Sequence, residues 1–388
     1  MQMTECLRVP AAACALTLAV CAASVAAPDP NTNDAAAARL AEQARAAAAA
    51  QLARLGEGYE VRFDSARRLV FVSALDEEHF RQTARLVAKF SDAIRKTLDL
   101  SPPTSLVTVV LPTAEDYAEL RPGEEVTGFY TPADRTLISL DRGRVLVHEF
   151  THALHHADAA AARQQHRVWV WEGLATLCDA SNITPGGVLD PQVDVRVVAL
   201  QKAIRRAQTI PLEKLVDLTP GEFHARAELC YAEARYLMLY LHERDKLPAF
   251  YAAYKGGFED DPTGRIALED VLGRRLGDIE DDWETWALEL EMPWGELRSG
   301  EARLGLGLQD TPQGAKVVSL APGSAAERAG RIHVGDIVLA FNGVPTSCAA
   351  EVVGAVQACG ANQTVNVELR RRGRQITIQQ PLGAPRQR

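Results

Sequence analysis

The stretch GRVLVHEFTHALHH, residues 143–156, constrains the fold of this chain more than any other segment, because it places histidines and a glutamate within a run of apolar residues. His148 and His152 are four positions apart, so on a helix both imidazoles project from the same face. The apolar neighbours indicate that the helix is buried, and a buried polar group without a partner costs free energy. We therefore expect a buried helix whose two histidines bind one metal ion.

Residues 148–152 form the pattern HExxH, whose geometry and ligand types suit zinc. Glu149 lies beside the two histidines and is predicted to act as the general base that takes a proton from water. A catalytic zinc site usually has three protein ligands. Glu172, in the apolar segment VWVWEGLATLCDA, is the candidate for the third, the alternative being a surface glutamate on an amphipathic helix. One zinc ion is thus the expected cofactor.

The HExxH pattern followed by WEGLA resembles the gluzincin, or peptidase-MA-like, zinc metallopeptidases over residues 58–295. The preceding segment GFYTPADRTLISL resembles the edge-strand region of bacterial members. The resemblance implies His148, His152 and Glu172 as zinc ligands and Glu149 as general base and acid. It also implies a zincin-like α+β domain with a small N-terminal mixed sheet and a helical C-terminal half.

The chain departs from this family at the position four residues after the third ligand, where thermolysin-type relatives carry an acidic residue and this sequence has Thr176. Asp179 is a possible replacement for orienting a ligand histidine. A rival, metzincin-like scheme takes Asp158 as the third ligand. That pattern needs a glycine for a turn where this chain has His155, so we favour Glu172 and expect His155 and His156 on the helix surface.

Hydrolysis also needs a group that stabilises the oxyanion of the reacting carbonyl. Related gluzincins often place a tyrosine from a later helix over the zinc, and the segment ELCYAEARYLMLYL offers Tyr231 for this role. His224 is the alternative. A plain core tyrosine is an equally open interpretation of Tyr231.

The order of apolar patterns predicts an α+β arrangement, with a small sheet first and helices second. Alternating segments within residues 59–74, 105–112 and 128–141 are predicted strands, and residues 76–100 form a long amphipathic helix. Further helices are predicted at about 143–158, 169–180, 191–208, 222–244 and 278–291.

Residues 302–383 are rich in glycine and β-branched side chains. Their segments RLGLGLQD, APGSAAERAG and GDIVLAFNG resemble a PDZ domain of the bacterial, protease-associated kind, a β-sandwich or barrel with two helices. The glycines would let backbone N–H groups bind the terminal carboxylate of a peptide, with residues 349–358 as the helical wall of the groove. A spacer without a peptide ligand is the alternative. The predicted peptide-binding residues are Gly305, Leu306, Gly307 and Leu308.

The first thirty residues carry Arg8, an apolar run and small residues before PDP, a pattern typical of a secretory signal peptide over residues 1–27. We therefore expect export to the periplasm or the extracellular space. The segment LAVC at residues 18–21 loosely resembles a lipobox, so lipoprotein anchoring is a less favoured alternative. Residues 28–57 are predicted to be an alanine-rich linker or helix, and no transmembrane segment is expected in the mature chain.

If the chain is exported, its cysteines can form disulfides, because an oxidising compartment permits them. Four cysteines would remain: Cys178, Cys230, Cys348 and Cys359. The last two flank a predicted helix and would lie roughly 16 Å apart, too far to bridge. A Cys178–Cys230 disulfide and four free thiols are equally open.

These features predict an exported zinc metallopeptidase, most simply an endopeptidase, whose PDZ domain recruits or gates protein or peptide substrates. The net charge of -9 and pI of about 5.6 argue against a nucleic-acid partner. Two alternatives are a non-catalytic, PDZ-centred peptide-binding protein on an idle zincin scaffold, and a hydrolase of non-protein amide or ester bonds.

Overall fold

The computed structural model describes seven stretches of the chain. These are residues 30–101, 103–123, 126–291, 302–311, 313–346, 348–357 and 359–383. The chain divides into two compact units, residues 1–42 and 43–388. Within the first unit, the described residues form the beginning of helix α1 (Pro30–Leu52). The predicted signal peptide, residues 1–27, lies outside the described residues.

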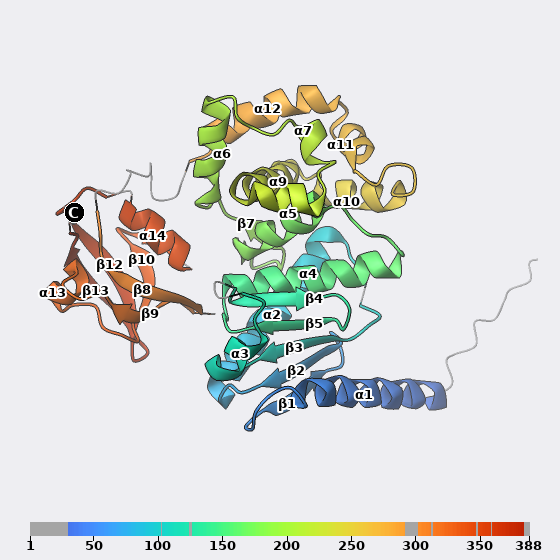
Figure 1. The fold of residues 1–388 in the computed structure, drawn as a ribbon, viewed down its shortest axis with the longest axis horizontal. Coiled ribbons are helices and arrows are strands. Elements are labelled where there is room, and N and C mark those ends of the chain that lie inside the picture. The colour runs from blue at the N-terminus through green and yellow to red at the C-terminus, as the bar shows by residue number, and fades with distance from the viewer. Residues whose placement is uncertain are drawn as a thin grey trace, which may run out of the picture. The chain divides into compact units, whose positions relative to one another are not determined.

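The second unit contains a five-stranded mixed sheet in the order β1-β2-β3-β5-β4 (Figure 1). The pairs β2–β3 and β3–β5 are parallel, whereas β1 and β4 run antiparallel at the edges. The central strands β2 and β3 are buried along their whole length, as expected for strands covered on both faces. The strands are β1 (Glu60–Asp64), β2 (Leu69–Ser73), β3 (Val107–Leu111), β4 (Gly128–Thr131) and β5 (Thr136–Ser139).

Helix α2 (Glu77–Leu98) joins the parallel strands β2 and β3, a connection that requires a crossover segment. The Asp76 side chain caps its start and accepts a hydrogen bond from the His79 backbone N–H at 3.0 Å. Asp99 ends the helix in the left-handed conformation, with φ of 51°. The apolar face of α2 packs on the sheet. A short helix, α3 (Ala114–Leu120), follows β3.

The alanine-rich segment buries more surface than the sequence predicted. Ala44 and Ala48, in the second half of α1, belong to a hydrophobic cluster with residues of β2, β3 and β5. Gln51 Nε2 donates a hydrogen bond to Thr136 Oγ1 at 3.1 Å. Small side chains let this part of the helix pack against the sheet, so it is more than a linker.

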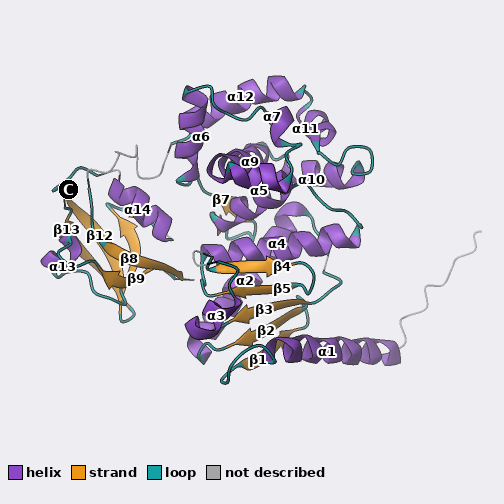
Figure 2. Cartoon of the chain, viewed as in Figure 1, coloured by secondary structure: helices purple, strands orange, loops and turns teal. Residues whose placement is uncertain are grey.

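Helix α4 (Arg144–Ala161) runs along the edge strand β4 (Figure 2). Gly128 on β4 permits this close approach, because a Cβ atom there would lie 2.7 Å from Val145 Cγ1 and 2.8 Å from Ser139 Oγ. Such separations are shorter than Cβ atoms tolerate, so any other residue would force Val145, Ser139 or the backbone to shift.

Residues 144–291 are mainly helical, with one short hairpin of β6 and β7. Helix α5 packs against both α4 and α9. None of the described helices is long and apolar enough to cross a bilayer. After α4, the elements are α5 (Val168–Asp179), β6 (Ser181–Ile183), β7 (Leu189–Pro191), α6 (Arg196–Arg205), α7 (Leu212–Leu215), α8 (Pro220–Ala225), α9 (Ala227–Glu243), α10 (Leu247–Gly256), α11 (Arg265–Leu272) and α12 (Leu276–Glu289).

The helix predicted over residues 222–244 is two helices, α8 and α9. The backbone leaves helical geometry at Arg226, with φ of -125° and ψ of 38°. Helix α6 is shorter than the predicted range of 191–208. Helices α7, α10 and α11 were not predicted, because short helices carry too few turns for a clear apolar period.

The C-terminal module has a six-stranded sheet in the order β13-β12-β10-β9-β8, with β11 paired to β10. It has its own hydrophobic core. Helix α14 (Ala349–Gln357) packs against β8, β9 and β10, and α13 (Ala325–Ala329) packs against β13. The strands are β8 (Leu306–Thr311), β9 (Gly314–Leu320), β10 (Ile337–Phe341), β11 (Val344–Pro345), β12 (Thr364–Arg371) and β13 (Arg374–Pro381). The predicted α+β class with a β-rich C-terminal module is confirmed.

The substitution Gly173→Ala tests the contact between α5 and α9, because a Cβ atom at this position would come within 2.9 Å of the Ala234 carbonyl oxygen. We expect Gly173→Ala to lower the free energy of unfolding by about 1–3 kcal/mol, measured by denaturant titration. The matched control is Gly277→Ala on α12, where nothing lies within 4 Å of an added Cβ atom. The control should be neutral or slightly stabilising, and equal stability of the two variants would contradict the close packing.

Candidate metal centre

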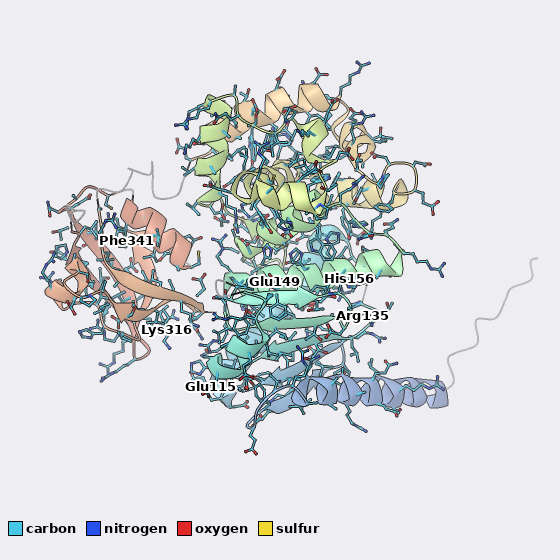
Figure 3. All side chains as sticks on the ribbon, in the orientation of Figure 1. Glu115, Arg135, Glu149, His156, Lys316 and Phe341 are labelled. Atoms are coloured by element: carbon cyan, nitrogen blue, oxygen red, sulfur yellow. The ribbon has the colours of Figure 1, made fainter. Side chains whose placement is uncertain are left out.

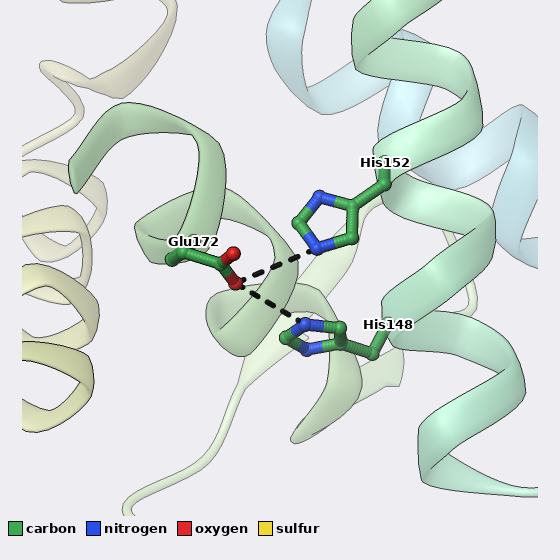
Figure 4. A group of neighbouring side chains, drawn as sticks. All are labelled: His148, His152 and Glu172. Atoms are coloured by element: carbon green, nitrogen blue, oxygen red, sulfur yellow. Dashed lines mark ion pairs between the residues drawn. The ribbon is translucent and has the colours of Figure 1, made fainter. Parts of the chain in front are cut away.

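Helices α4 and α5 bring His148, His152 and Glu172 together (Figure 4). Glu172 Oε2 lies 3.4 Å from His148 Nε2 and 3.5 Å from His152 Nε2. One donor atom from each residue lies within 4.8 Å of the other two, and the described residues contain no second group of this kind. We call these three residues the His-His-Glu cluster. Its donor atoms are close enough to hold one metal ion.

The His-His-Glu cluster lies among apolar side chains. His152 is 6% exposed and Glu172 is 7% exposed. The indole ring of Trp171 stacks on the His152 imidazole, with ring centroids 5.1 Å apart and 12° between the planes. Trp171 was not among the predicted site residues. The stacking fixes the plane of the imidazole, and exclusion of water strengthens the electrostatic interactions within the cluster.

Asp179, at the end of α5, orients His148. Its Oδ2 lies 3.1 Å from His148 Nδ1. A carboxylate accepts a hydrogen bond from the Nδ1–H group, which leaves Nε2 facing Glu172. The sequence suggested Asp179 as the replacement for the acidic residue absent at Thr176. The Thr176 hydroxyl instead donates a hydrogen bond to the Glu172 backbone carbonyl at 2.6 Å.

A buried network of ion pairs holds Asp179 in place. Arg144 Nη2 lies 2.7 Å from Asp179 Oδ1 and 2.7 Å from Asp194 Oδ2. Arg196 approaches the same two carboxylates at 3.0 and 2.6 Å. Arg235, on α9, lies 3.2 Å from Asp194 Oδ1 through Nε. Each carboxylate contacts at least two guanidinium groups, so neither is left unpaired.

Four members of this network were not predicted as functional residues: Arg144, Asp194, Arg196 and Arg235. One signal was present in the sequence. Arg235 is followed by the apolar run YLMLYL, and a charged residue within a buried apolar helix is normally paired. Its side chain is 0% exposed. The other three residues follow no spacing that distinguishes them from surface residues.

The charges of the His-His-Glu cluster stabilise one another. Burial opposes protonation of His148, but the hydrogen bond with Asp179 and the nearby Glu172 raise the pKa of the imidazole to about 10. Burial also opposes ionisation of Glu172, yet the two imidazoles hold its pKa below the ordinary value. The buried carboxylate and the two imidazoles thus favour each other's charged forms.

Glu149 follows His148 on α4 and is partly exposed (Figure 3). Burial raises the pKa of its carboxyl group, while the histidine charges and the Tyr130 backbone N–H act in the opposite direction. A carboxyl group with a raised pKa exchanges protons more readily near neutral pH. The position beside the cluster and the raised pKa both suit a general base.

The two oxyanion candidates lie in different surroundings. Burial and the nearby Glu172 carboxylate raise the pKa of the Tyr231 hydroxyl, which lies beside the cluster. His224 is exposed on α8, and its Nδ1 lies 2.7 Å from the Pro220 carbonyl oxygen. Within the described residues, no hydrogen bond, ion pair or ring contact joins His224 to the cluster, although its ring lies 6.3 Å from that of Tyr231.

The expectation that His155 and His156 lie on the helix surface is wrong for His155, whereas His156 is partly exposed. His155 is 3% exposed, and its Nε2 lies 2.7 Å from His166 Nδ1. The Tyr130 hydroxyl lies 2.8 Å from His156 Nδ1, and His156 is only partly exposed. Aromatic side chains of α5 and α10 cover this side of α4, which the sequence of α4 alone could not indicate.

Asp158, the third ligand of the rival metzincin-like scheme, lies outside the cluster. Its Oδ2 accepts hydrogen bonds from the Tyr251 hydroxyl at 2.8 Å and from Lys255 Nζ at 2.8 Å. Helix α4 continues through His155 without the turn that this scheme requires. The geometry therefore favours Glu172.

The four described cysteines are buried, and Cys178 and Cys230 are both free thiols. The disulfide between Cys178 and Cys230, which the sequence left open, is not formed. Burial raises the pKa of the Cys178 thiol to about 12, so it stays protonated at neutral pH.

The C-terminal module carries a separate cavity of about 270 Å³ between β8 and α14. Three of the four predicted peptide-binding residues line it, whereas Gly307 does not. Gly305 adopts φ of 81°, a conformation that favours glycine. The lining residues are Ala302, Arg303, Leu304, Gly305, Leu306, Leu308, Val352, Val353 and Val356.

Residues 302–382 match the sequence profile of the PDZ domain family. The PDZ domain predicted over residues 302–383 is therefore confirmed. No curated protein matches the chain.

Several solved structures show partial likeness. The HtrA-type protease AlgW with decapeptide is 18% identical, with a TM-score of 0.21, over 23% of this chain and 30% of that chain. A serine endoprotease from Yersinia pestis is 26% identical, with a TM-score of 0.20, over 28% and 36%. An aminopeptidase N family protein from Idiomarina loihiensis is 14% identical, with a TM-score of 0.37, over 84% and 67%. The chain thus spans about a third of the first two structures, and such low TM-scores establish no shared overall fold.

The contact between Asp179 and His148 predicts that Asp179 contributes to the affinity for zinc. We expect Asp179→Asn to raise the zinc dissociation constant about 10- to 100-fold, because the amide no longer holds His148 as a carboxylate does. Competition with a zinc-binding dye measures the constant, and circular dichroism of the metal-free protein shows whether the variant is folded. Asp190→Asn, at an exposed position, is the control and should leave the constant unchanged. A folded Asp179→Asn variant with wild-type affinity would contradict the orienting role.

Proposed function

We propose that residues 58–295 form a zinc-dependent peptidase domain, most simply an endopeptidase. The observation that supports this best is the His-His-Glu cluster, whose donor atoms lie within 4.8 Å of one another on two buried helices beside Glu149. One zinc ion would be held by His148, His152 and Glu172.

The donor set fits zinc. Two imidazole nitrogens and one carboxylate oxygen are a ligand set that leaves a fourth position open for water or substrate. Glu172 Oε2 is buried without a hydrogen-bond partner, which is costly unless a positive charge lies nearby. The contact between His148 Nδ1 and Asp179 leaves Nε2 available to a metal.

A bound zinc ion supplies a Lewis acid that makes water nucleophilic near neutral pH. Glu149 takes the proton that the water loses as its oxygen attacks the peptide carbonyl carbon. The same carboxyl group then gives this proton to the amine nitrogen as the carbon–nitrogen bond breaks. The raised pKa of Glu149 supports both transfers, because it brings the pKa closer to the pH of the reaction.

We assign stabilisation of the oxyanion to Tyr231. Its hydroxyl lies beside Glu172, and its raised pKa keeps it protonated at neutral pH. A protonated hydroxyl can donate a hydrogen bond to the carbonyl oxygen as negative charge develops there. His224 is the weaker candidate, because its contacts do not reach the cluster.

The PDZ domain is proposed to recruit or gate substrates through the cavity between β8 and α14. Backbone N–H groups near Leu306 and Leu308 would bind a terminal carboxylate, and the apolar lining would take the last side chain of the peptide. We further propose that residues 1–27 direct export, so that this protein acts on proteins or peptides in the periplasm or outside the cell.

Replacement of Glu149 tests the function directly. Zinc-loaded wild-type protein should cleave a diverse peptide library, as measured by mass spectrometry, and bind one zinc ion per chain. Glu149→Gln should retain the zinc but lose about 10²- to 10⁴-fold in kcat, because the amide cannot accept the proton. His148→Ala should lose both the zinc and the activity.

The outcomes separate the alternatives. Equal cleavage by wild type and Glu149→Gln would exclude Glu149 as the base. Bound zinc without cleavage of any peptide would contradict a peptidase, and would favour either hydrolysis of non-protein amide or ester bonds or a PDZ-centred binding protein. Failure of the folded wild type to bind zinc would contradict the metal site itself.

Tyr231→Phe tests the oxyanion assignment. We expect kcat to fall about 10²- to 10³-fold with little change in KM, because the lost hydrogen bond acts in the transition state. Tyr240→Phe, on the same helix, is the control and should keep the wild-type kcat. A large loss in His224→Gln with none in Tyr231→Phe would transfer the role to His224.

A further inference from the structure

Two cavities of about 530 and 810 Å³ lie between helix α6 and the start of α9. Four residues line both cavities: Ala199, Lys202, Ala227 and Glu228. The cavities are therefore parts of one continuous depression, which we call the α6–α9 groove.

One end of the α6–α9 groove is lined by two residues that lie beside the metal centre or contact its supporting residues. Its inner cavity is lined by Tyr231, beside the His-His-Glu cluster, and by Arg196, which contacts Asp179 at 3.0 Å. Its outer cavity is lined by Gln208 and His224. A peptide that crosses the cluster would consequently place residues next to the cut bond in this groove.

Two cations in the groove are available to a ligand. Lys202 and Arg226 are exposed, and neither forms an ion pair with any residue that the structure describes. Arg226 makes one long hydrogen bond, of 3.5 Å, to the Gln208 backbone carbonyl. By contrast, Arg196 already pairs with Asp179 and Asp194. The groove thus presents positive charge in a chain whose net charge is -9.

One anion, Glu228, also lines both cavities. It is exposed and forms no ion pair within the described residues. It stands against Lys202 and Arg226, whereas Arg196, the third cation of the lining, is already paired with buried carboxylates. The electrostatic balance along the groove therefore favours an acidic ligand, and Glu228 weakens that preference.

We propose that Lys202 and Arg226 select substrates with an acidic residue two or three positions from the bond that is cut. Lys202 follows Arg196 by six positions, which is about 9 Å along α6. An extended peptide covers this distance with two to three residues at about 3.3 Å each. The inference rests on the proposed peptidase function, because it assumes that the peptide crosses the His-His-Glu cluster.

The test measures binding and cleavage separately. Fluorescent peptides carry Asp, Gln or Lys at each position within three residues of a central bond, and they end in an amide so that the PDZ domain has no carboxylate to bind. Zinc-loaded, full-length Glu149→Gln protein reports their dissociation constants without turnover. We expect Asp at two or three positions from the centre to bind about fivefold more tightly than Lys, a difference that falls as salt rises.

Variants of opposite sign separate recognition from structural damage. Lys202→Glu, introduced into the Glu149→Gln protein, should abolish or reverse the preference for Asp, whereas Glu228→Gln should strengthen it. Arg205→Glu, an equal charge change on α6 at a residue that lines neither cavity, should leave it unchanged. A general loss of folding would affect all peptides alike and could not produce opposite shifts.

The same peptides are then given to wild-type protein. Cleavage without an acidic preference, or a preference untouched by Lys202→Glu, would overturn this inference and leave the peptidase function standing. A preference for Lys would also overturn it and would assign recognition to Glu228. Selective binding of acidic peptides that are never cut would support the groove assignment and contradict the peptidase function.

Discussion

The burial of one carboxylate between two imidazoles is the constraint on which the helical half of this protein depends. Burial of the Glu172 carboxylate costs several kcal/mol unless a positively charged group lies next to it in the apolar interior. Helices α4 and α5 must therefore stay in contact. Two glycines meet the steric demand, Gly128 where α4 passes the sheet and Gly173 where α5 meets α9. The buried charge and these two close contacts together fix α4 and α5 within the domain.

The buried network of ion pairs contacts the His-His-Glu cluster through Asp179 and His148. Buried ion pairs add little net stability compared with apolar packing, because both charges lose their hydration. Their contribution here is geometric. Asp179 accepts contacts from two guanidinium groups and from His148, so its carboxylate has few other orientations to adopt. Removal of one guanidinium group would leave each carboxylate with fewer charged partners and more freedom to turn.

The sequence indicated the parts of this protein that depend on local pattern. The strands, the long amphipathic helix, the PDZ domain and the spacing of His148 and His152 each follow from periodicity or from a specific motif. The ion-pair network and the buried His155 depend on which helices pack together, and no single segment carries that information. Arg235 is intermediate, because a charge before an apolar run indicates a buried partner without identifying it.

Helix α6 carries both a residue of the ion-pair network and a residue that lines the groove. Arg196 at its first turn belongs to the support of the metal centre, whereas Lys202, near the other end, lines the groove without an ion pair. Substitution of Lys202 would leave the ion-pair network intact, whereas substitution of Arg196 would remove one of the guanidinium groups that contact Asp179 and Asp194. The buried ion pairs therefore restrict which residues the first turn of α6 can carry, and Lys202 is outside that restriction.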